Sequence, residues 1–402
     1  MMNKQNKYDY YLIALIASLG AGEFGGALQL PRAIAILLIP ALLKAAATTP
    51  KHIIKKPRTF AVVILAWSFI SLAWTGSFER GLEELVYFIV HMLYFLEIVV
   101  FTSKSNKQIR SISTGWCIAV LATAAVAFWE IQTGQHLITS KMQEDKVLST
   151  GFVRRFASAT FYNFNDYEVF LCYSVPFLLV AISTMKKWKE TTLFFLALLC
   201  AVVVCIFNAS RGATIAILTM TVLGLLGIIN KSSTSRKYIF VLVSLFTFIL
   251  YKYADAIFMN LAARLEISTM AESVRTEIWY LALLCLENTM FIGTGIAGVE
   301  KGMSVVSNDY LAPHNLFLEI LVEFGIFIFT FIAGILLKML RHTAKGKSPY
   351  KRIIIATFIA WPIIAIVSSK YLLCPDLYAF IASFYVLIYH EKYTQTIHRP
   401  LW

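Results

Sequence analysis

The chain has 402 residues, of which 58% are hydrophobic, and it carries a formal net charge of +13. Its mean hydropathy of +0.70 is far above the range of soluble proteins, so a soluble globular fold of this size is excluded. In such a sequence, an apolar run of about 18 or more residues predicts a membrane-spanning helix, because backbone groups in lipid must be hydrogen-bonded within the segment.

About twelve such runs follow one another along the chain. The first two and the last two are separated only by short connections. The pattern predicts an all-α, polytopic integral membrane protein, with residues 1–402 forming one membrane domain and no appended soluble module. The predicted spans lie near residues 10–28, 30–47, 60–75, 84–102, 112–131, 167–185, 191–207, 212–229, 238–257, 315–339, 352–369 and 372–390.

The basic residues indicate the orientation of the chain. With the N-terminus on the cytoplasmic side, 23 of the 36 lysines and arginines fall in inward-facing segments and 12 in outward-facing ones. Short basic loops face the cytoplasm in membrane proteins, so the charge is mainly a topology signal and no nucleic-acid partner is expected. The six cysteines form no C-x-x-C pair, so neither a metal site nor a disulfide framework is indicated.

Two long segments are predicted on the outer face. The first, residues 132–166, contains Arg154 and Arg155, together with Asn163 and Asn165 in an aromatic-rich run. The second, residues 258–313, is the large outer loop. Its stretch 272–288 has helical periodicity and predicts an amphipathic helix along the membrane boundary. The apolar face of that helix would contain Ile278, Trp279, Leu281, Ala282 and Cys285.

Arg211 follows one apolar run and begins the next, with only a tight turn between them. A guanidinium offers a planar fork of donors that stays protonated, which favours a phosphate-binding role. Its neighbours Ser210 and Gly212 would add a hydroxyl donor and allow close approach of the backbone. The alternative is an arginine that extends to the interface and marks a helix end.

Arg275 and His314 lie in the large outer loop. Arg275 follows Glu272 by three residues, so an exposed ion pair on a helix is the alternative to a substrate contact. His314 is expected to begin a spanning helix, with Pro313 in the first turn. Imidazole can accept a proton near neutral pH, which makes His314 a candidate general base; the alternative is a hydrated interfacial histidine.

A polar stripe follows His314. Asn315, Glu319 and Glu323 recur every four residues, which places them on one face of the predicted helix. Carboxylates within a membrane segment are costly and usually face a cavity or a partner. These three residues are therefore candidate substrate-binding residues.

Residues 293–298 read Gly-Thr-Gly-Ile-Ala-Gly and match the dinucleotide-binding pattern G-x-G-x-x-G letter for letter. The pattern requires a preceding strand and a βαβ unit, and neither is predicted here. We interpret the run as a turn that folds the loop back onto the helical bundle, and we predict no cofactor.

The order and sidedness of these motifs resemble the superfamily of O-antigen ligases and O-antigen polymerases. The resemblance covers roughly residues 150–330, although each motif is short. It rests on Phe161–Asn165, Ser210–Ala213, Arg275 with Trp279, Gly293–Gly295, Pro313–Asn315 and Glu323–Gly325.

The resemblance implies a metal-independent glycosyltransferase of the bacterial inner membrane, with its active site facing the periplasm. Members take a glycan from an undecaprenyl-diphosphate carrier; ligases transfer it to lipid A–core and polymerases to a carrier-linked repeat unit. By motif, the essential residues of the family fall on Arg211, Arg275 and His314. Arg154, Arg155, Asn163, Asn165, Ser210, Asn315, Glu319 and Glu323 are the further candidates for substrate contacts.

The chemistry of the predicted site agrees with that family. Outside the cytoplasm no ATP is available, so the donor must arrive activated, and a diphosphate is already a good leaving group. Ligase and polymerase share these motifs and differ in acceptor; the single large loop favours the ligase. A multispan transporter or lipid flippase is a further alternative, but no internal repeat is evident. A non-catalytic membrane scaffold is the last alternative.

Overall fold

The computed structural model describes residues 6–141, 146–147, 153–184, 188–229, 275–307, 312–368 and 370–397, together with residues 240, 244, 248, 251, 252, 254, 255 and 258. Within these ranges the regular secondary structure is helical apart from one pair of two-residue strands, β1 (Lys146–Val147) and β2 (Val153–Arg154), which pair antiparallel. The predicted all-α fold is therefore confirmed for the described part of the chain.

Six of the described helices are long and apolar enough to cross a membrane, as expected of a multi-pass membrane protein. α14 (Pro375–Ile388) is apolar but shorter. The predicted number of twelve spans is not confirmed, and most of the predicted span 238–257 lies outside the described residues. The six helices are α4 (Phe78–Lys104), α5 (Gln108–Thr133), α6 (Phe164–Thr184), α7 (Trp188–Phe207), α8 (Arg211–Ile229) and α12 (Leu316–Lys345).

The remaining helices are shorter or more polar. The predicted span 10–28 is wrong in its second half, because the helix ends at Ala17. Beyond it, Gly22 and Gly25 adopt positive φ values of 53° and 95° and turn the chain. The elements are α1 (Asn6–Ala17), the 3₁₀ turns η1 (Ser18–Ala21) and η2 (Gly26–Leu28), α2 (Leu30–Ala46), α3 (Lys51–Ser71), a helical stretch over 275–288, α11 (Val299–Ser307), α13 (Lys351–Ile364) and α15 (His390–Ile397).

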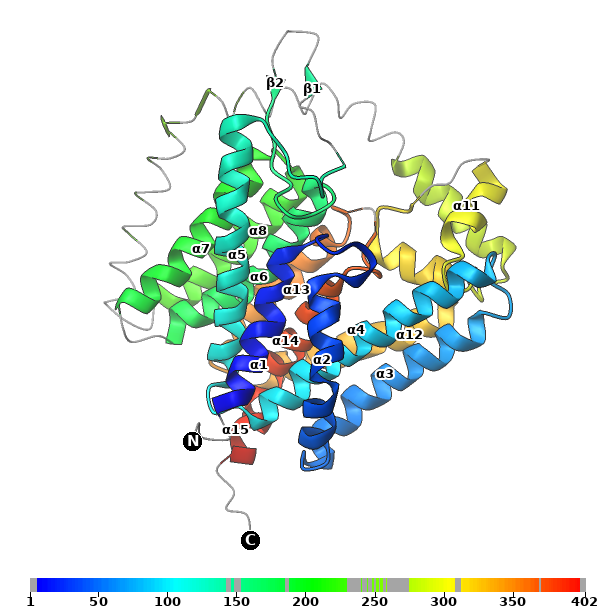
Figure 1. The fold of residues 1–402 in the computed structure, drawn as a ribbon, viewed down its shortest axis with the longest axis horizontal. Coiled ribbons are helices and arrows are strands. Elements are labelled where there is room, and N and C mark those ends of the chain that lie inside the picture. Colours follow the sequence, from blue (N-terminus) through cyan, green and yellow to red (C-terminus); the bar gives the residue numbers. More distant parts are fainter. Residues whose placement is uncertain are drawn as a thin grey trace.

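The helices form a bundle with two distinct ends (Figure 1). The start of α1 and the helix α15 lie at one end, and β1 and β2 lie at the other, which we call the site end. α13 packs along α8 and α6, while α14 packs along α4 and α6. The connection between α13 and α14, residues 365–374, therefore lies among helices from both halves of the chain; residue 369 of this connection is not described.

α12 is interrupted at Gly325, where φ is 74° and ψ is −177°. The loop at 291–295 packs into this break: the backbone N–H of Thr294 donates to the carbonyl of Val322 (2.7 Å), and that of Gly295 donates to the carbonyl of Glu323 (3.0 Å). Because the break frees these helix carbonyls, the loop supplies the missing donors. The predicted turn at Gly293–Gly295 is thus confirmed, and it folds back onto α12.

The predicted amphipathic helix is described from residue 275 onward and is helical to residue 288. Ile278, Ala282 and Cys285 are buried on one face and pack with Val299 and Met303 of α11. The apolar face is therefore confirmed, and it packs against protein. The predicted position of this helix along the membrane boundary stays a prediction, and Glu272 lies outside the described residues.

Candidate active site

Arg275 and Trp279 lie one helical turn apart and reach two different segments. Nη1 of Arg275 donates a hydrogen bond to the carbonyl of Ile366, 3.1 Å away, in the connection between α13 and α14. Nε1 of Trp279 donates to the carbonyl of Pro313, 3.0 Å away. A single turn of this helix therefore links Pro313, the residue before His314, to the α13–α14 connection.

His314 does not begin a helix, as the sequence predicted, but precedes one. α12 begins at Leu316, and Asn315 is its N-cap: the side-chain oxygen of Asn315 accepts from the N–H groups of Phe317 (2.9 Å) and Leu318 (3.3 Å). His314 has a φ of 50°, which turns the chain sharply before this cap. The difference arises because Asn is a strong N-cap residue, so the helix begins at Leu316, two residues after the predicted start at His314.

The imidazole of His314 is half-buried, and its Nδ1 has no hydrogen-bond partner among the described residues. Burial, and secondly the positive charge of Arg275, lower the pKa of His314 to about 4. The ring is therefore neutral at neutral pH. A neutral imidazole with an open nitrogen can accept a hydrogen bond or a proton.

Arg211 is exposed and opens α8. The turn before it is fixed by Asn208, which is fully buried. The amide of Asn208 accepts from the N–H of Ala157 (2.7 Å) and donates to the carbonyl of the same residue (2.9 Å). Ser210, also buried, accepts through its carbonyl from Thr214 (2.9 Å). The sequence folds this way because a buried amide must satisfy both of its polar atoms.

The segments that carry these three residues meet at residues 365–367. The N–H of Leu316 donates to the carbonyl of Ala365 (2.8 Å). Arg275 contacts Ile366, as described above. A Cβ added at Gly212 would lie 3.2 Å from Cγ2 of Val367, so the backbone next to Arg211 packs closely there. Ala365, Ile366 and Val367 thus lie against Leu316, Arg275 and Gly212, respectively. Arg275 is itself a predicted catalytic residue. Leu316 lies two residues after His314, and Gly212 lies next to Arg211.

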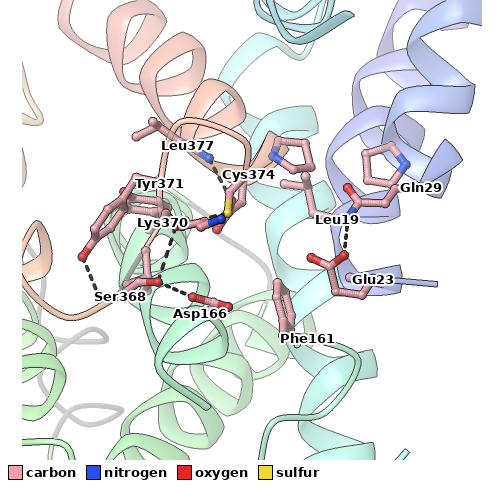
Figure 2. Close-up of a pocket in the computed structure, with 16 residues that line it drawn as sticks. Leu19, Glu23, Gln29, Phe161, Asp166, Ser368, Lys370, Tyr371, Cys374 and Leu377 are labelled. Atoms are coloured by element: carbon pink, nitrogen blue, oxygen red, sulfur yellow. Dashed lines mark hydrogen bonds between the residues drawn. The ribbon is translucent and has the colours of Figure 1, made fainter. Parts of the chain in front are cut away.

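The aromatic-rich motif reaches the same connection. The side-chain oxygen of Asn163 accepts from the N–H of Asp166 (3.0 Å), and its amide donates to Oδ2 of Asp166 (2.6 Å). The other carboxylate oxygen of Asp166 accepts from the hydroxyl of Ser368 (Figure 2). Oδ1 of Asn165 is buried without a hydrogen-bond partner among the described residues. Both asparagines therefore lie at the site end. Asn163 caps the start of α6 through Asp166, and Asn165 has an acceptor oxygen without a partner among the described residues.

The two carboxylates of the polar stripe bind backbone. Glu319 is buried and accepts from the N–H groups of Tyr371 (3.0 Å) and Leu372 (3.3 Å). Glu323 is also buried and accepts from the N–H of Ala297 (3.2 Å). These contacts position the α13–α14 connection and the loop after Gly295. Substrate binding by Glu319 and Glu323 stays a prediction.

In the part of the chain that the structure describes, Arg155 contacts another segment. The backbone of Arg154 forms part of β2. Nη1 of Arg155 donates to the carbonyls of Ile131 (3.0 Å) and Gln132, at the end of α5. Among the described residues, no group of three or more His, Cys, Asp or Glu side chains could hold a metal ion. Metal independence stays a prediction.

Several residues at this end were not found by sequence reasoning. Arg32 is buried and donates to the carbonyl of Leu373 (3.0 Å), so it holds the connection from the side of α2. Glu130 is fully buried beside Nδ1 of His136 (3.2 Å) and accepts from the N–H groups of Ser158 and Ala159. The one signal available was that Arg32 and Glu130 are charged residues at the ends of apolar runs, which predicts a partner but not its identity.

Comparison with known proteins identifies the same region. Residues 196–333, about a third of the chain, match the family model described as O-Antigen ligase. This range contains Arg211, Arg275 and His314, and the resemblance predicted from the motifs is confirmed. A similar protein is the teichuronic acid biosynthesis protein TuaE of Bacillus subtilis (strain 168), 20% identical over 278 residues. That match covers 65% of this chain and about half, 55%, of the relative.

Proposed function

From this O-antigen ligase family domain and from the geometry of its site, we propose that the protein is a glycosyltransferase. It would transfer a glycan from an undecaprenyl-diphosphate carrier to an acceptor hydroxyl at the periplasmic face of the bacterial inner membrane. The observation that carries the proposal is the meeting at residues 365–367 of the segments that contain Arg211, Arg275 and His314. These segments are separated by tens of residues in the sequence.

In the proposed reaction, the acceptor oxygen forms a bond to the anomeric carbon, and the bond from that carbon to the diphosphate oxygen breaks. The electron pair leaves with the diphosphate, and the hydroxyl proton passes to His314. Arg211 and Arg275 would bind the diphosphate and stabilise its growing negative charge, each through charge-assisted bonds worth about 1.5–3 kcal/mol. In-line attack would invert the anomeric centre.

The electrostatics support these roles. The positive charge of Arg275 acts on His314 and, after burial, contributes to lowering its pKa, so negative charge bound by Arg275 would also act on the imidazole. His314 is neutral before reaction and can take a proton without first losing one. Once the leaving group brings negative charge between them, the protonated imidazole becomes less costly.

The donor carries a long lipid chain, and an apolar cavity begins beside His314. Its volume is about 450 Å³, and it lies between α3, α4, α12 and α14. Leu316 and Phe317, the first residues of α12, are among its lining residues, as are Lys55, Lys56 and Lys338. A largely apolar space that opens next to the diphosphate site is suited to a polyprenyl chain.

The polymerase is the second candidate function. It uses the same donor chemistry and differs in the acceptor, which would be a carrier-linked repeat unit rather than lipid A–core. The observation that favours it is the similarity to TuaE, whose name connects that protein with teichuronic acid biosynthesis. The single large loop that ends at His314 favours the ligase.

The deciding experiment uses a strain that lacks this gene, complemented with wild type or His314→Ala, and examines the surface glycan on a gel. We expect wild type to restore the ladder and His314→Ala to leave it missing. Polymer that accumulates on the carrier with a bare core would identify a ligase; one capped repeat unit on the core would identify a polymerase. An unchanged ladder in the deletion strain would contradict both.

A further inference from the structure

Three lysines line the apolar cavity between α3, α4, α12 and α14, and we call them the lysine cluster. Lys55 and Lys56 come from the second turn of α3, and Lys338 lies two turns before the end of α12. The other described residues that line the cavity are uncharged, and none of the described lining residues is acidic. Positive charge beside an apolar cavity suits a molecule with an anionic head group and a hydrocarbon chain.

The lysine cluster lies at the end of the bundle opposite the site end. Nζ of Lys56 is 5.9 Å from the centre of the Tyr389 ring. The ring of His342, one turn after Lys338, stacks on the same tyrosine with 4.6 Å between the ring centres. Tyr389 directly precedes α15, which lies at the end away from β1 and β2 (Figure 1). The start of α3, the end of α12 and the end of α14 therefore meet there.

Further positive charge lies next to this cluster. Nζ of Lys392, in α15, is 4.8 Å from the centre of the Tyr389 ring, so two ammonium groups share one aromatic ring. Burial, and secondly the positive charge of Lys56, lower the pKa of Lys392. Lys56 and Lys392 therefore repel each other. A bound anion would offset this repulsion, so this end of the bundle favours negative charge.

The diphosphate of the donor cannot be this anion. Along α12, Lys338 lies about six turns after Leu316, which is roughly 30 Å at 5.4 Å per turn. A diphosphate held by Arg211 and Arg275 at the site end is therefore out of reach of the lysine cluster. The hydrocarbon core of a bilayer is also about 30 Å thick, so the two ends match the two surfaces of one membrane. The charge pattern predicts that the lysine cluster faces the inner leaflet.

The cavity has room for a lipid chain. Its volume of about 450 Å³ falls within the range of pockets that hold small molecules, about 300–1,000 Å³. Phe331 and Ile335, one and two turns before Lys338, line it, as does Tyr385, one turn before Tyr389. A hydrocarbon chain that enters here leaves water for an apolar surface, while its head group stays beside the lysines.

We propose that the lysine cluster binds the phosphate of an anionic phospholipid of the inner leaflet, and that an acyl chain of this lipid enters the cavity. Phosphatidylglycerol is a lipid of this class. An ammonium group binds phosphate as a compact charge, and basic pockets between membrane helices bind such head groups. The inference does not depend on glycan transfer. It leaves the part of the cavity beside Leu316 to the polyprenyl chain of the donor.

The test measures tryptophan fluorescence of the full-length chain in phosphatidylcholine nanodiscs that contain increasing fractions of phosphatidylglycerol with brominated acyl chains, which quench nearby tryptophans. Trp361 is the only tryptophan among the described lining residues, so the quenching that is lost in Trp361→Phe reports a chain inside the cavity. We expect half of this quenching at an about tenfold lower fraction of phosphatidylglycerol than of brominated phosphatidylcholine. Combining Lys55→Gln, Lys56→Gln and Lys338→Gln should raise the half-quenching fraction of phosphatidylglycerol about tenfold.

The matched control combines Lys51→Gln, Lys345→Gln and Lys347→Gln, which remove the same charge from exposed lysines near the same helix ends but outside the described cavity lining. It should behave as wild type. Equal half-quenching fractions in the two triple variants would overturn the head-group assignment. Equal quenching by the two brominated lipids would do the same. Equal quenching in wild type and Trp361→Phe would show that no chain enters the cavity. All six lysines are exposed, so both triple variants should fold.

Discussion

His314 is positioned by backbone contacts on both sides, and its Nδ1 has no hydrogen-bond partner among the described residues. Its φ of 50° lies in the left-handed region, which residues other than glycine avoid at a cost of about 1–2 kcal/mol. Trp279 binds the carbonyl of Pro313 before it, and Ala365 accepts from Leu316 after it. Two hydrogen bonds that hold the neighbours can maintain such a conformation. The ring is left open toward a substrate.

The pH dependence follows from the burial of His314 and from the positive charge of Arg275. Because burial and Arg275 lower the pKa of His314 to about 4, the imidazole stays neutral until the pH falls toward that value, and kcat should fall below it. Arg275→Gln removes the positive charge that disfavours imidazolium, so the pKa should rise and the acidic limb of kcat should move to higher pH. The measurement is the pH profile of kcat in nanodiscs, with exposed Arg341→Gln as the control. Identical acidic limbs in wild type and Arg275→Gln would exclude His314 as the titrating base.

At the scale of elements, the break in α12 is held by the loop at 291–295. The N–H of Ile326 donates to the carbonyl of Phe291 (2.9 Å), which adds to the two bonds from Thr294 and Gly295. Trp74 of the segment after α3 donates to the carbonyl of Gly293 (3.1 Å). The loop therefore joins α3 to α12 and fixes the direction in which the first turns of α12, with Glu319, meet the α13–α14 connection.

Gly325→Ala should disrupt this junction. A Cβ there would overlap the carbonyl oxygen of Ile292, and alanine strongly disfavours a φ of 74°. We expect the variant to lose about 2 kcal/mol or more of stability and most of its transfer activity. Gly334→Ala is the control in the same helix: a Cβ there meets nothing within 4 Å, so it should be neutral or stabilise by up to about 1 kcal/mol. The measurement is Tm in detergent, and equal Tm values for the two variants would contradict this account.

At the scale of the whole molecule, sequence patterns predicted the features that depend on residues close together in the chain, such as helices and their ends. Apolar runs predicted the helices α4 to α8 and α12 closely, and they placed Arg211 correctly at the start of α8. The helix start predicted at His314 was two residues too early. Sequence reasoning missed the α13–α14 connection, because its contacts use backbone carbonyls of Ala365 and Ile366, which every residue possesses. It also missed the partner of Asp166, since Ser368 lies 202 residues away in the chain. Such pairings depend on how α8 and α13 pack, which no local period encodes.

The orientation of the bundle is the prediction that remains at this scale. Inward-facing segments were predicted to hold 23 of 36 basic residues, so the site end should face the periplasm. Glu79 at the start of α4 and Lys51 at the start of α3 are both exposed, and α3 separates them. In spheroplasts, an impermeant thiol reagent should modify Glu79→Cys at once and Lys51→Cys only after lysis, with the unsubstituted chain as background. The opposite pattern would place Arg211 and His314 on the cytoplasmic side, where a carrier-linked glycan at the outer face could not reach them.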